Sequence, residues 1–249
     1  MMTLKDKVAI VTGGTRGIGR AIVLMLAKSG CHVIFNYQKS EDKAQALVKE
    51  IAALGVKGKA SCIDIRDFDK VKQWIEDIKN EFKRIDILIN NAGILNDKVL
   101  MMMEPKDWQE VIDTNLNGVF NACRCCIVTF LKQKSGRIIN VSSVGGIVGL
   151  PRQVNYSAAK GGINAFTKAL AKEVANYGVL VNAVAPGYIA TVMLSGLTQE
   201  QKNKIVDAIP LSRIGSPEDV AACVKFLLSE QARYITGQII QIDGGLAMR

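Results

Sequence analysis

Short apolar runs alternate with longer amphipathic segments from one end of the chain to the other. Runs of roughly four to eight apolar and β-branched residues are typical of buried strands, whereas the longer segments place their apolar residues on one face of a helix. Strands are predicted at Val8–Thr12, Val33–Asn36, Lys59–Ile63, Ile87–Asn90, Arg137–Ser142, Leu180–Ala185 and Gln238–Ile242. Because strands and helices alternate, we expect a doubly wound α/β fold with seven parallel strands and helices on both faces of the sheet.

Helices are predicted between these strands, at Gly17–Ser29, Glu41–Leu54, Asp67–Phe82, Pro105–Lys132, Asn155–Tyr177 and Pro217–Ser229. Local signals support several of their ends. Ser216 and Pro217 provide a cap and a first helical residue, and Gly30 and Gly55 each follow a predicted helix, as glycine commonly does. The stretch Pro186–Ser216 contains no predicted strand, and we expect it to cover a substrate.

The composition is that of an ordinary globular protein. The chain has 249 residues, of which 49% are hydrophobic and 22% are charged. Since no Pro-, Ser- or Gly-rich linker divides it, we expect one domain over residues 1–249. The sequence shows neither a secretory signal nor an apolar run of about 18 residues, which predicts a cytoplasmic protein without a membrane span, or one inside an organelle after removal of a targeting segment.

Charge and cysteine content narrow the classes of partner and ligand. The net charge of +9 suits nucleic acid, an anionic membrane surface or an acidic protein, or it reflects a solvated basic surface. Nucleic-acid binding is disfavoured because aromatic residues make up only 6% and no recognition motif is present. The six cysteines lack paired CxxC spacing, so we expect reduced, mostly buried thiols and no metal site, even at the cluster Cys123, Cys125 and Cys126.

Glycines follow the first predicted strand. The run Thr12-Gly13-Gly14-Thr15-Arg16-Gly17-Ile18-Gly19 lies between that strand and the first predicted helix. Glycines at this place let a tight turn form, let the backbone approach a pyrophosphate and let the helix pack against the strand. The helix N-terminus then offers free N–H groups to the phosphates. The turn therefore predicts a dinucleotide site of the Rossmann type.

A tyrosine and a lysine, Tyr156 and Lys160, fall four residues apart in a predicted helix. This spacing puts both side chains on one helix face, where the ammonium lowers the pKa of the phenol from its usual value near 10. The preceding strand ends at Ser142 and Ser143. The pattern indicates a proton-transfer site, although the pair taken alone also fits an exposed helix face.

These segments together resemble the short-chain dehydrogenase/reductase family over essentially the whole chain. The glycine spacing Gly-x-x-x-Gly-x-Gly, the Asn90–Gly93 segment and the Tyr-x-x-x-Lys pair carry the resemblance. It implies hydride transfer from a nicotinamide cofactor to a carbonyl group, with Tyr156 as the proton donor and Lys160, Ser143 and Asn115 in support. Ser142 is the alternative to Ser143. For Asn115, a structural role is the alternative to holding a water in a proton relay that ends at Lys160.

The resemblance also implies a set of cofactor-binding residues. They are Gly13, Thr15, Arg16, Gly17, Ile18, Gly19, Tyr37, Lys39, Asp64, Ile65, Asn91, Ala92, Gly93, Tyr156, Lys160, Pro186, Gly187, Ile189 and Thr191. NADPH is predicted over NADH because no acid precedes Glu41 after the second strand, whereas Arg16 and Lys39 can hold a 2′-phosphate. The alternative is that both cations are solvated. Asp64 is expected either to receive the adenine amino group or to be a strand-end turn residue.

Within the family, segments such as Gly93–Asp97 and Tyr234–Gly237 look most like bacterial-type 3-oxoacyl-[acyl-carrier-protein] reductases of fatty-acid synthesis. This implies a 3-oxoacyl thioester on an acyl carrier protein as the substrate, and a homotetramer. The alternatives are reduction of acetoacetyl-CoA, a sugar, a steroid or a xenobiotic ketone, and a non-catalytic dinucleotide sensor. Candidates for docking the acidic carrier are Lys132, Lys134, Arg137, Lys168 and Lys172, and candidate subunit-interface helices are Val119–Leu131 and Ile163–Val174.

Overall fold

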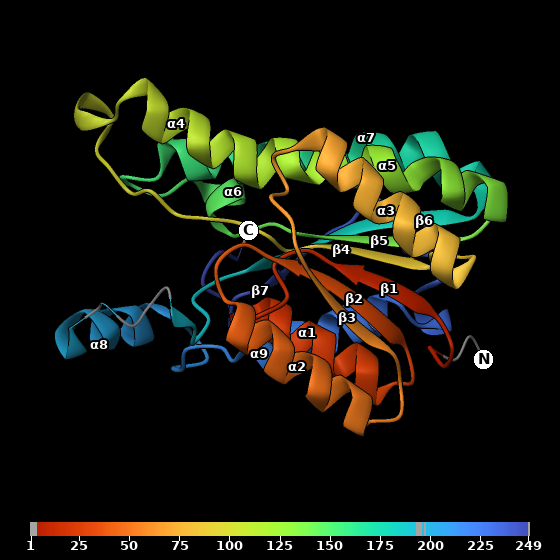
Figure 1. Ribbon diagram of the computed structural model, residues 1–249. Helices are drawn as coiled ribbons and strands as arrows, with labels where there is room; N and C mark the ends of the chain where they lie inside the picture. Colours follow the sequence, from red (N-terminus) through yellow and green to blue (C-terminus); the bar gives the residue numbers. More distant parts are fainter. Residues whose placement is uncertain (1–3, 193–195, 197, 249) are drawn as a thin grey trace.

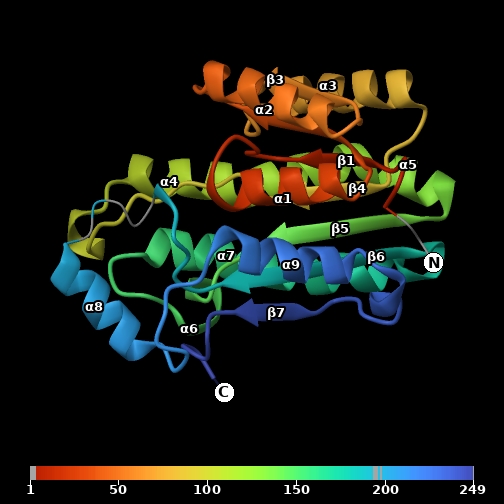
Figure 2. The ribbon, with the colours of Figure 1, turned by 90° about the horizontal axis from the view of Figure 1, so that it is seen from below.

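The computed structural model describes residues 4–192, 196 and 198–248, and it contains a sheet of seven parallel strands (Figures 1 and 2). The strands are β1 (Val8–Val11), β2 (His32–Tyr37), β3 (Gly58–Cys62), β4 (Ile87–Asn90), β5 (Gly136–Val141), β6 (Val179–Pro186) and β7 (Ile239–Ile242). The predicted strand bounds differ from these by at most one residue at either end. The prediction of a doubly wound Rossmann fold is therefore confirmed.

The strand order is β3-β2-β1-β4-β5-β6-β7, so the chain winds outward in both directions from the centre of the sheet. Residues of β1 pair with β2 on one side, at Val11 and Phe35, and with β4 on the other, at Val11 and Ile89. The order reverses between β1 and β4. Ligands of open α/β sheets bind in the crevice outside the carboxyl ends of the strands at such a point.

Helices cover both faces of the sheet (Figure 1). One face carries α1 (Gly17–Lys28), α2 (Glu41–Ala53) and α9 (Pro217–Leu227), and the other carries α3 (Phe68–Phe82), α4 (Pro105–Ile112), α5 (Gly118–Gln133) and α7 (Val154–Val174). Each face has its own apolar core. On α1, for example, Ile22 and Leu26 lie four residues apart and are fully buried, which stabilises the fold by about 1.5–3 kcal/mol for each side chain.

The helix predicted at Pro105–Lys132 differs from the structure in one respect. A π-helical turn at Asp113–Asn117 separates α4 from α5. The side chain of Asn115 within this turn bonds the main chain of Ile94 in both directions, which gives the wider turn a tertiary partner. A continuous α-helix is therefore the wrong description of this segment.

The predicted helix ends have the expected local chemistry. Ser216 Oγ accepts a hydrogen bond from Asp219 N, and the Asp219 carboxylate accepts one from Ser216 N, which makes a capping box at the start of α9. Gly30 and Gly55 follow α1 and α2 with φ of 85° and 79°, values that favour glycine.

Two short helices were not predicted, α6 (Gly145–Val148) and α8 (Gln199–Ala208). The second belongs to the segment expected to cover a substrate and extends beyond the carboxyl edge of the sheet (Figure 2). Residues 193–195 and 197 of that segment lie outside the described residues. Over the described part of the chain, none of the helices has the length and apolar character needed to cross a membrane.

Candidate functional site

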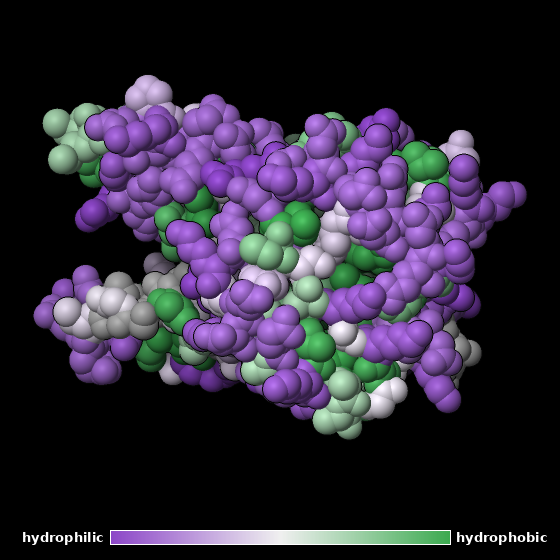
Figure 3. All heavy atoms as spheres, viewed as in Figure 1, coloured by the Kyte–Doolittle hydropathy of each residue, from purple (hydrophilic) through white to green (hydrophobic). Residues whose placement is uncertain are grey.

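A cavity of about 1070 Å³ opens at the carboxyl edge of the sheet, where the strand order reverses. The space-filling view is hollowed on its left side, between the part that carries α4 and the part that carries α8 (Figure 3). Most of the predicted cofactor-binding residues line this cavity, namely Gly13, Thr15, Arg16, Gly17, Ile18, Tyr37, Lys39, Ile65, Asn91, Ala92, Gly93, Tyr156, Lys160, Pro186, Gly187, Ile189 and Thr191. Its volume is at the upper end of the range usual for small-molecule sites, about 300–1,000 Å³.

The glycine turn between β1 and α1 forms one wall of the cavity. Gly13 and Gly17 have φ of 69° and 52°, values that favour glycine, and a Cβ at Gly13 would come within 3.0 Å of Ala92 Cα. The N-terminus of α1 begins at Gly17, so its unpaired N–H groups face a site suited to an anion. This is the arrangement that a pyrophosphate requires.

Gly19 does not line the cavity. It is buried and lies behind the cavity wall, where a Cβ would come within 2.2 Å of Gly13 O and 2.5 Å of Asn91 Nδ2. The glycine therefore lets α1 pack against the turn and supports the cofactor wall from behind.

The segment after β4 is joined to this turn. The side chain of Asn91 donates to the main-chain oxygens of Thr12 and Gly13, each at 2.9 Å. In return, the hydroxyl of Thr12 accepts hydrogen bonds from Asn91 N and Ala92 N. These bonds fix the spacing between the two chain segments on which a dinucleotide would lie.

Asp64 also lies outside the cavity lining, although Ile65 is part of it. The carboxylate of Asp64 accepts hydrogen bonds from the guanidinium of Arg66 at 2.6–3.0 Å. The pKa of Asp64 is accordingly lowered, chiefly by the hydrogen bond from Arg66. This geometry favours the strand-end turn interpretation of Asp64.

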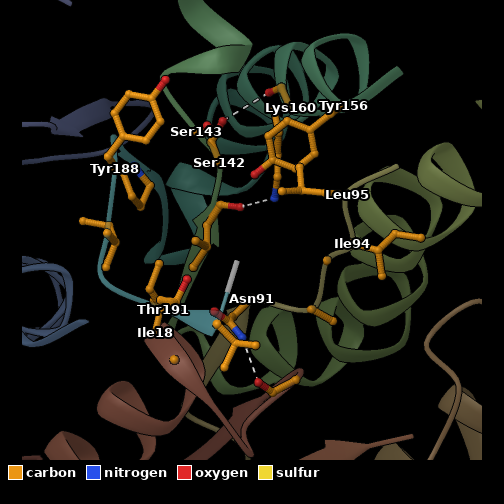
Figure 4. Close-up of a pocket in the computed structure, with 18 of the residues that line it drawn as sticks. Ile18, Asn91, Ile94, Leu95, Ser142, Ser143, Tyr156, Lys160, Tyr188 and Thr191 are labelled. Atoms are coloured by element: carbon orange, nitrogen blue, oxygen red, sulfur yellow. Dashed lines mark hydrogen bonds between the residues drawn. The ribbon is translucent and has the colours of Figure 1, made fainter. Parts of the chain in front are cut away.

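Tyr156, Lys160 and Ser143 come together on one side of the cavity, opposite Asn91 and Thr191 (Figure 4). The first two lie near the start of α7, and Ser143 follows the end of β5. The ammonium of Lys160 lies 5.6 Å from the centre of the Tyr156 ring. The carboxyl end of a parallel strand and the start of a helix thus bring the three side chains to one place.

The two serines at the end of β5 have different partners. Ser142 is 3% exposed, and its hydroxyl donates to Asn164 Oδ1 at 2.7 Å. Ser143 Oγ accepts a hydrogen bond from Gly145 N at 3.1 Å, and its hydroxyl acts to lower the pKa of the Tyr156 phenol. Of the two serines, Ser143 is the one that influences the tyrosine.

Burial changes the proton affinity of the tyrosine and the lysine. It raises the pKa of Tyr156 to about 12, with Ser143 acting in the opposite direction, so the expected lowering of this pKa by Lys160 is wrong. It lowers the pKa of Lys160 to about 8. Both shifts disfavour the charged form, because these side chains are removed from water. At neutral pH the phenol therefore carries its proton.

Asn115 is fully buried and is absent from the cavity lining. Its Oδ1 accepts from Ile94 N at 2.8 Å, and its Nδ2 donates to Ile94 O at 3.0 Å. A Cβ at Gly93 would lie 3.2 Å from Asn115 Oδ1 and 3.7 Å from Lys160 Nζ. The asparagine is thus behind Gly93, close to the lysine, with both polar side-chain atoms bonded to Ile94.

Several lining residues were missed from the sequence. Leu95, Val148, Leu150 and Gln153 surround the tyrosine side of the cavity, and Ile205 of α8 lines its outer part. A signal for α8 was present, because Thr198 Oγ1 accepts from Gln201 N and the Gln201 side chain accepts from Thr198 N, the T-x-x-Q form of a capping box. The other residues come from the loop after β4 and from the stretch that runs from the end of α6 to the start of α7, and they share no motif.

Two of the predicted docking residues, Lys132 and Lys134, lie away from the cavity. Lys132 and Lys134 are at the end of α5, just before β5 begins at Gly136. The cavity is at the other end of that six-residue strand, about 20 Å away at the usual rise per residue. Arg137 is 7% exposed, so its assignment to a docking surface is wrong.

Comparisons with known proteins point to one family. A family model described as "Enoyl-(Acyl carrier protein) reductase" matches residues 13–247. The chain is 48% identical over 242 residues to the 3-oxoacyl-[acyl-carrier-protein] reductase FabG of Staphylococcus aureus (strain Mu50 / ATCC 700699), covering 97% of this chain and 98% of the relative. It is 49% identical to the 3-oxoacyl-[acyl-carrier-protein] reductase of Synechocystis sp. over 249 residues and the full length of both chains. Its identity to the FabG of Haemophilus influenzae is 46% over 98% of this chain and 99% of the relative.

The part of the sequence that the family model matches includes the segments that form the cavity. The family model covers the glycine turn, the Asn91–Gly93 segment and the Tyr156–Lys160 pair, all of which line the cavity. The cofactor class of this fold and family is a nicotinamide dinucleotide. The chain belongs to the short-chain dehydrogenase/reductase family, and it is similar over its whole length to proteins named 3-oxoacyl-[acyl-carrier-protein] reductase.

Proposed function

We propose that this protein reduces a 3-oxoacyl thioester, carried by an acyl carrier protein, to the 3-hydroxyacyl thioester in fatty-acid synthesis, with NADPH as the reductant. The observation that carries the proposal is the group of Tyr156, Ser143 and Lys160 in one cavity at the switch point of the sheet. Full-length similarity to proteins named 3-oxoacyl-[acyl-carrier-protein] reductase supports the choice of substrate.

Tyr156 is the proposed proton donor to the carbonyl oxygen. The phenol keeps its proton at neutral pH, since burial raises its pKa to about 12. Ser143, which lines the cavity together with the tyrosine, would donate to the same carbonyl oxygen and hold it in reach. The alkoxide that develops as hydride reaches the carbonyl carbon would be protonated as it forms.

The cavity fits a nicotinamide dinucleotide. Its wall contains two glycines with positive φ and the open N-terminus of α1, and its far side carries the buried ammonium of Lys160. Gly13, Gly17 and the Asn91–Gly93 segment would hold the pyrophosphate and the ribose, and Pro186–Ile189 would border the nicotinamide end. When bound, the cofactor supplies the hydride, and the protein supplies its orientation.

Lys160 is proposed to have two functions. Its ammonium would bind the nicotinamide ribose, and its charge would stabilise the phenolate that Tyr156 becomes after donating its proton. Reprotonation would run through Lys160 and a water near Asn115. Because both polar side-chain atoms of Asn115 bond Ile94, the main-chain oxygen of Asn115 is the group we assign to that water.

The proposed preference for NADPH rests on the charges at the adenosine end of the cavity. Arg16 and Lys39 line this end together with Tyr37. Neither cation forms a salt bridge with a carboxylate over the described ranges, 4–192, 196 and 198–248, so both can pair with a 2′-phosphate. No acid lies between Asn36 and Ser40 to accept a ribose diol.

A carrier protein as the partner is supported by the charge of this chain. The net charge of +9 would speed the encounter with an acidic protein, an effect that weakens as salt is added. We expect the rate constant kcat/KM for a carrier-linked substrate to fall several-fold between low salt and about 0.5 M salt. The value for a short, uncharged thioester should change little.

The homotetramer remains a proposal as well. The helix α5 exposes Phe120 and Val128, which are 49% and 47% accessible, and this apolar face would be covered in an assembly. No large apolar side chain of Ile163–Val174 is exposed to that degree, so the observed exposure supports α5 more than α7. Sedimentation at equilibrium should give a mass near four times 27.0 kDa.

One assay tests the proposed function against its alternatives. NADPH oxidation is followed with a 3-oxoacyl thioester on carrier protein, the same acyl group on CoA, an enoyl thioester, a ketone panel, and each substrate again with NADH. Turnover should be fastest with the 3-oxoacyl carrier thioester and NADPH. Reduction of the enoyl thioester alone, or of an unrelated ketone alone, would assign the site to another reductase, and cofactor binding without any turnover would favour a sensor.

A further inference from the structure

A buried carboxylate lies next to the cavity without lining it. Asp107, in the first turn of α4, is 5% exposed. Its Oδ1 accepts a hydrogen bond from Asn96 Nδ2 at 3.0 Å, and its Oδ2 accepts from Lys98 Nζ at 2.6 Å and from Glu104 N at 2.9 Å. Such a carboxylate fixes three separate chain positions, because each of its donors comes from a different residue.

Asn155 is the second buried polar residue of this group and directly precedes Tyr156. It is fully buried, and its Nδ2 donates to the main-chain oxygens of Asn96 at 3.0 Å and Asp107 at 3.2 Å. Its Oδ1 accepts from Tyr156 N at 2.8 Å. The first N–H groups of a helix have no partner within the helix, so Asn155 supplies one for the tyrosine at the start of α7.

The two residues therefore join three parts of the protein. Asn96 bonds both of them, through its side chain to Asp107 and through its main chain to Asn155. Lys98 adds a second link, since its main-chain N–H donates to Arg152 O at 2.9 Å. The loop after β4, the start of α4 and the start of α7 thus meet in one hydrogen-bonded group, which we call the Asp107–Asn155 hub.

The loop after β4 also borders the cofactor wall. Asn91 is bonded to the glycine turn, and Ile94 is bonded to Asn115, only two residues before Asn96. The loop main chain from Asn91 to Asn96 therefore connects the hydrogen bonds at the glycine turn with those that reach the main chain of Tyr156. It sets the position of the tyrosine relative to the dinucleotide wall on the side opposite Ser143.

We propose that Asp107 and Asn155 are positioning residues, which hold the hydroxyl of Tyr156 at the correct place relative to the hydride donor. This inference rests on the proposed function for its catalytic consequence, but the structural link can be measured without turnover. A displacement of about 1 Å at a reacting group can reduce a rate by roughly 100-fold, so a small movement of α7 is sufficient.

The test compares two buried aspartates. Asp107→Asn removes the charge that Lys98 and Glu104 N bind. Asp86→Asn is the matched control, because Asp86 is 4% exposed and is bonded by Lys7, Arg84 and Val8 N at the other edge of the sheet. Both variants should lose stability. Amide hydrogen exchange over residues 152–158 should rise about 10-fold in Asp107→Asn only, and cofactor affinity should stay within twofold of the parent protein.

Kinetics supply the second readout. In Asp107→Asn we expect kcat to fall about 10- to 100-fold with the KM of the cofactor unchanged, whereas Asp86→Asn keeps its kcat per folded enzyme. For oxidation of the 3-hydroxyacyl thioester, Tyr156 must lose its proton, and a tyrosine displaced from Lys160 does so at higher pH. The acidic limb of that pH profile should therefore move upward by at least half a pH unit.

The outcomes separate the hub from the proposed function. The hub is overturned if hydrogen exchange over residues 152–158 is unchanged in Asp107→Asn. It is also overturned if Asp107→Asn and Asp86→Asn have the same hydrogen exchange, the same kcat and the same acidic limb of the pH profile. Absence of thioester turnover in the parent protein overturns the proposed function, while hydrogen exchange still decides the hub. If Asp107→Asn does not fold, Asn96→Ala removes a single side-chain bond to Asp107, and it should give the same exchange pattern at smaller amplitude.

Discussion

The ammonium of Lys160 lies 5.6 Å from the centre of the Tyr156 ring and donates a 2.7 Å hydrogen bond to Val141 O. The lysine therefore bonds the carboxyl end of β5 and places its ammonium beside the tyrosine ring. Because the side chain is 3% exposed, its charge is poorly solvated, and burial lowers its pKa to about 8. A charge held at such a cost is more consistent with a functional role than with a stabilising one.

Replacement of Tyr156 by Phe should abolish reduction of the carbonyl. The variant removes only the hydroxyl, so the ring keeps its packing and the cavity keeps its shape. We expect kcat to fall at least 1,000-fold, consistent with loss of general acid catalysis together with the contact to Ser143. A fluorescence titration should give a dissociation constant for NADPH within about twofold of the parent value. The control is Tyr177→Phe, because Tyr177 is 44% exposed and lies outside the cavity lining. Retention of most of the rate in Tyr156→Phe would refute the assignment.

Lys160→Met should inactivate the enzyme without lowering its stability at pH 7. The lowered pKa of about 8, against the usual 10.5, means that the buried ammonium reduces the free energy of unfolding by about 3 kcal/mol, and the variant removes this loss. The variant also loses the hydrogen bond to Val141 O, which reduces the free energy of unfolding by about 1–3 kcal/mol. The net change is a gain of about 1 kcal/mol in the free energy of unfolding at pH 7. Urea denaturation measures it, with the exposed Lys168→Met as the control.

The stability difference between the parent protein and Lys160→Met should depend on pH. Since the folded pKa lies below the unfolded value, the unfolded chain binds more protons between pH 8 and 10.5. The parent protein should therefore gain stability relative to Lys160→Met as the pH rises through this range. A difference between the two proteins that is constant from pH 7 to 10 would contradict the buried, charged lysine.

The fold was predictable because its signals are local and repeated. The apolar strand runs and the amphipathic helices have distinct periods. Gly30 marks a helix end by its positive φ, and Ser216 marks a helix start by its side-chain cap. The π-turn at Asp113–Asn117 was not predictable in this way. Its residues also suit an α-helix, so no local signal marks the wider turn. The hydrogen bonds that accompany it join Asn115 to Ile94, which is 21 positions away in the sequence.

The site was predictable only where one motif carries several residues. Tyr156 and Lys160 share a helix, and the glycine turn is contiguous, so their common location follows from the alternating fold. Leu95 and Gln153 are 58 positions apart in the sequence and meet only through the topology. The place of Gly19 behind the cavity depends on its close approach to Gly13 O, which no spacing reveals.

Removal of either cation at the adenosine end should reduce the preference for NADPH. Arg16→Ala and Lys39→Ala should each raise the KM of NADPH about 10-fold, equivalent to about 1.4 kcal/mol, because an ion pair with the 2′-phosphate is lost. The KM of NADH should change less than twofold. Arg20→Ala is the control, since Arg20 lies on α1 outside the cavity lining and pairs with Glu50 at 2.8 Å. Equal effects on the two cofactors would mean that Arg16 and Lys39 do not contact the phosphate.

Gly19→Ala should weaken cofactor binding although Gly19 does not line the cavity. Its new Cβ would lie 2.2 Å from Gly13 O and 2.5 Å from Asn91 Nδ2, so the glycine turn has to move and the 2.9 Å bond between these two groups has to lengthen. We expect the dissociation constant of NADPH to rise at least 10-fold and the melting temperature to fall. Gly161→Ala is the control, because its Cβ would meet nothing closer than 3.5 Å. In the interior of a helix, alanine is also more stabilising than glycine by about 0.5–1 kcal/mol. That variant should be as stable as the parent protein or more so. If Gly19→Ala binds NADPH with unchanged affinity, the turn does not depend on the close packing of α1, and the cofactor wall is held by the Asn91 bonds alone.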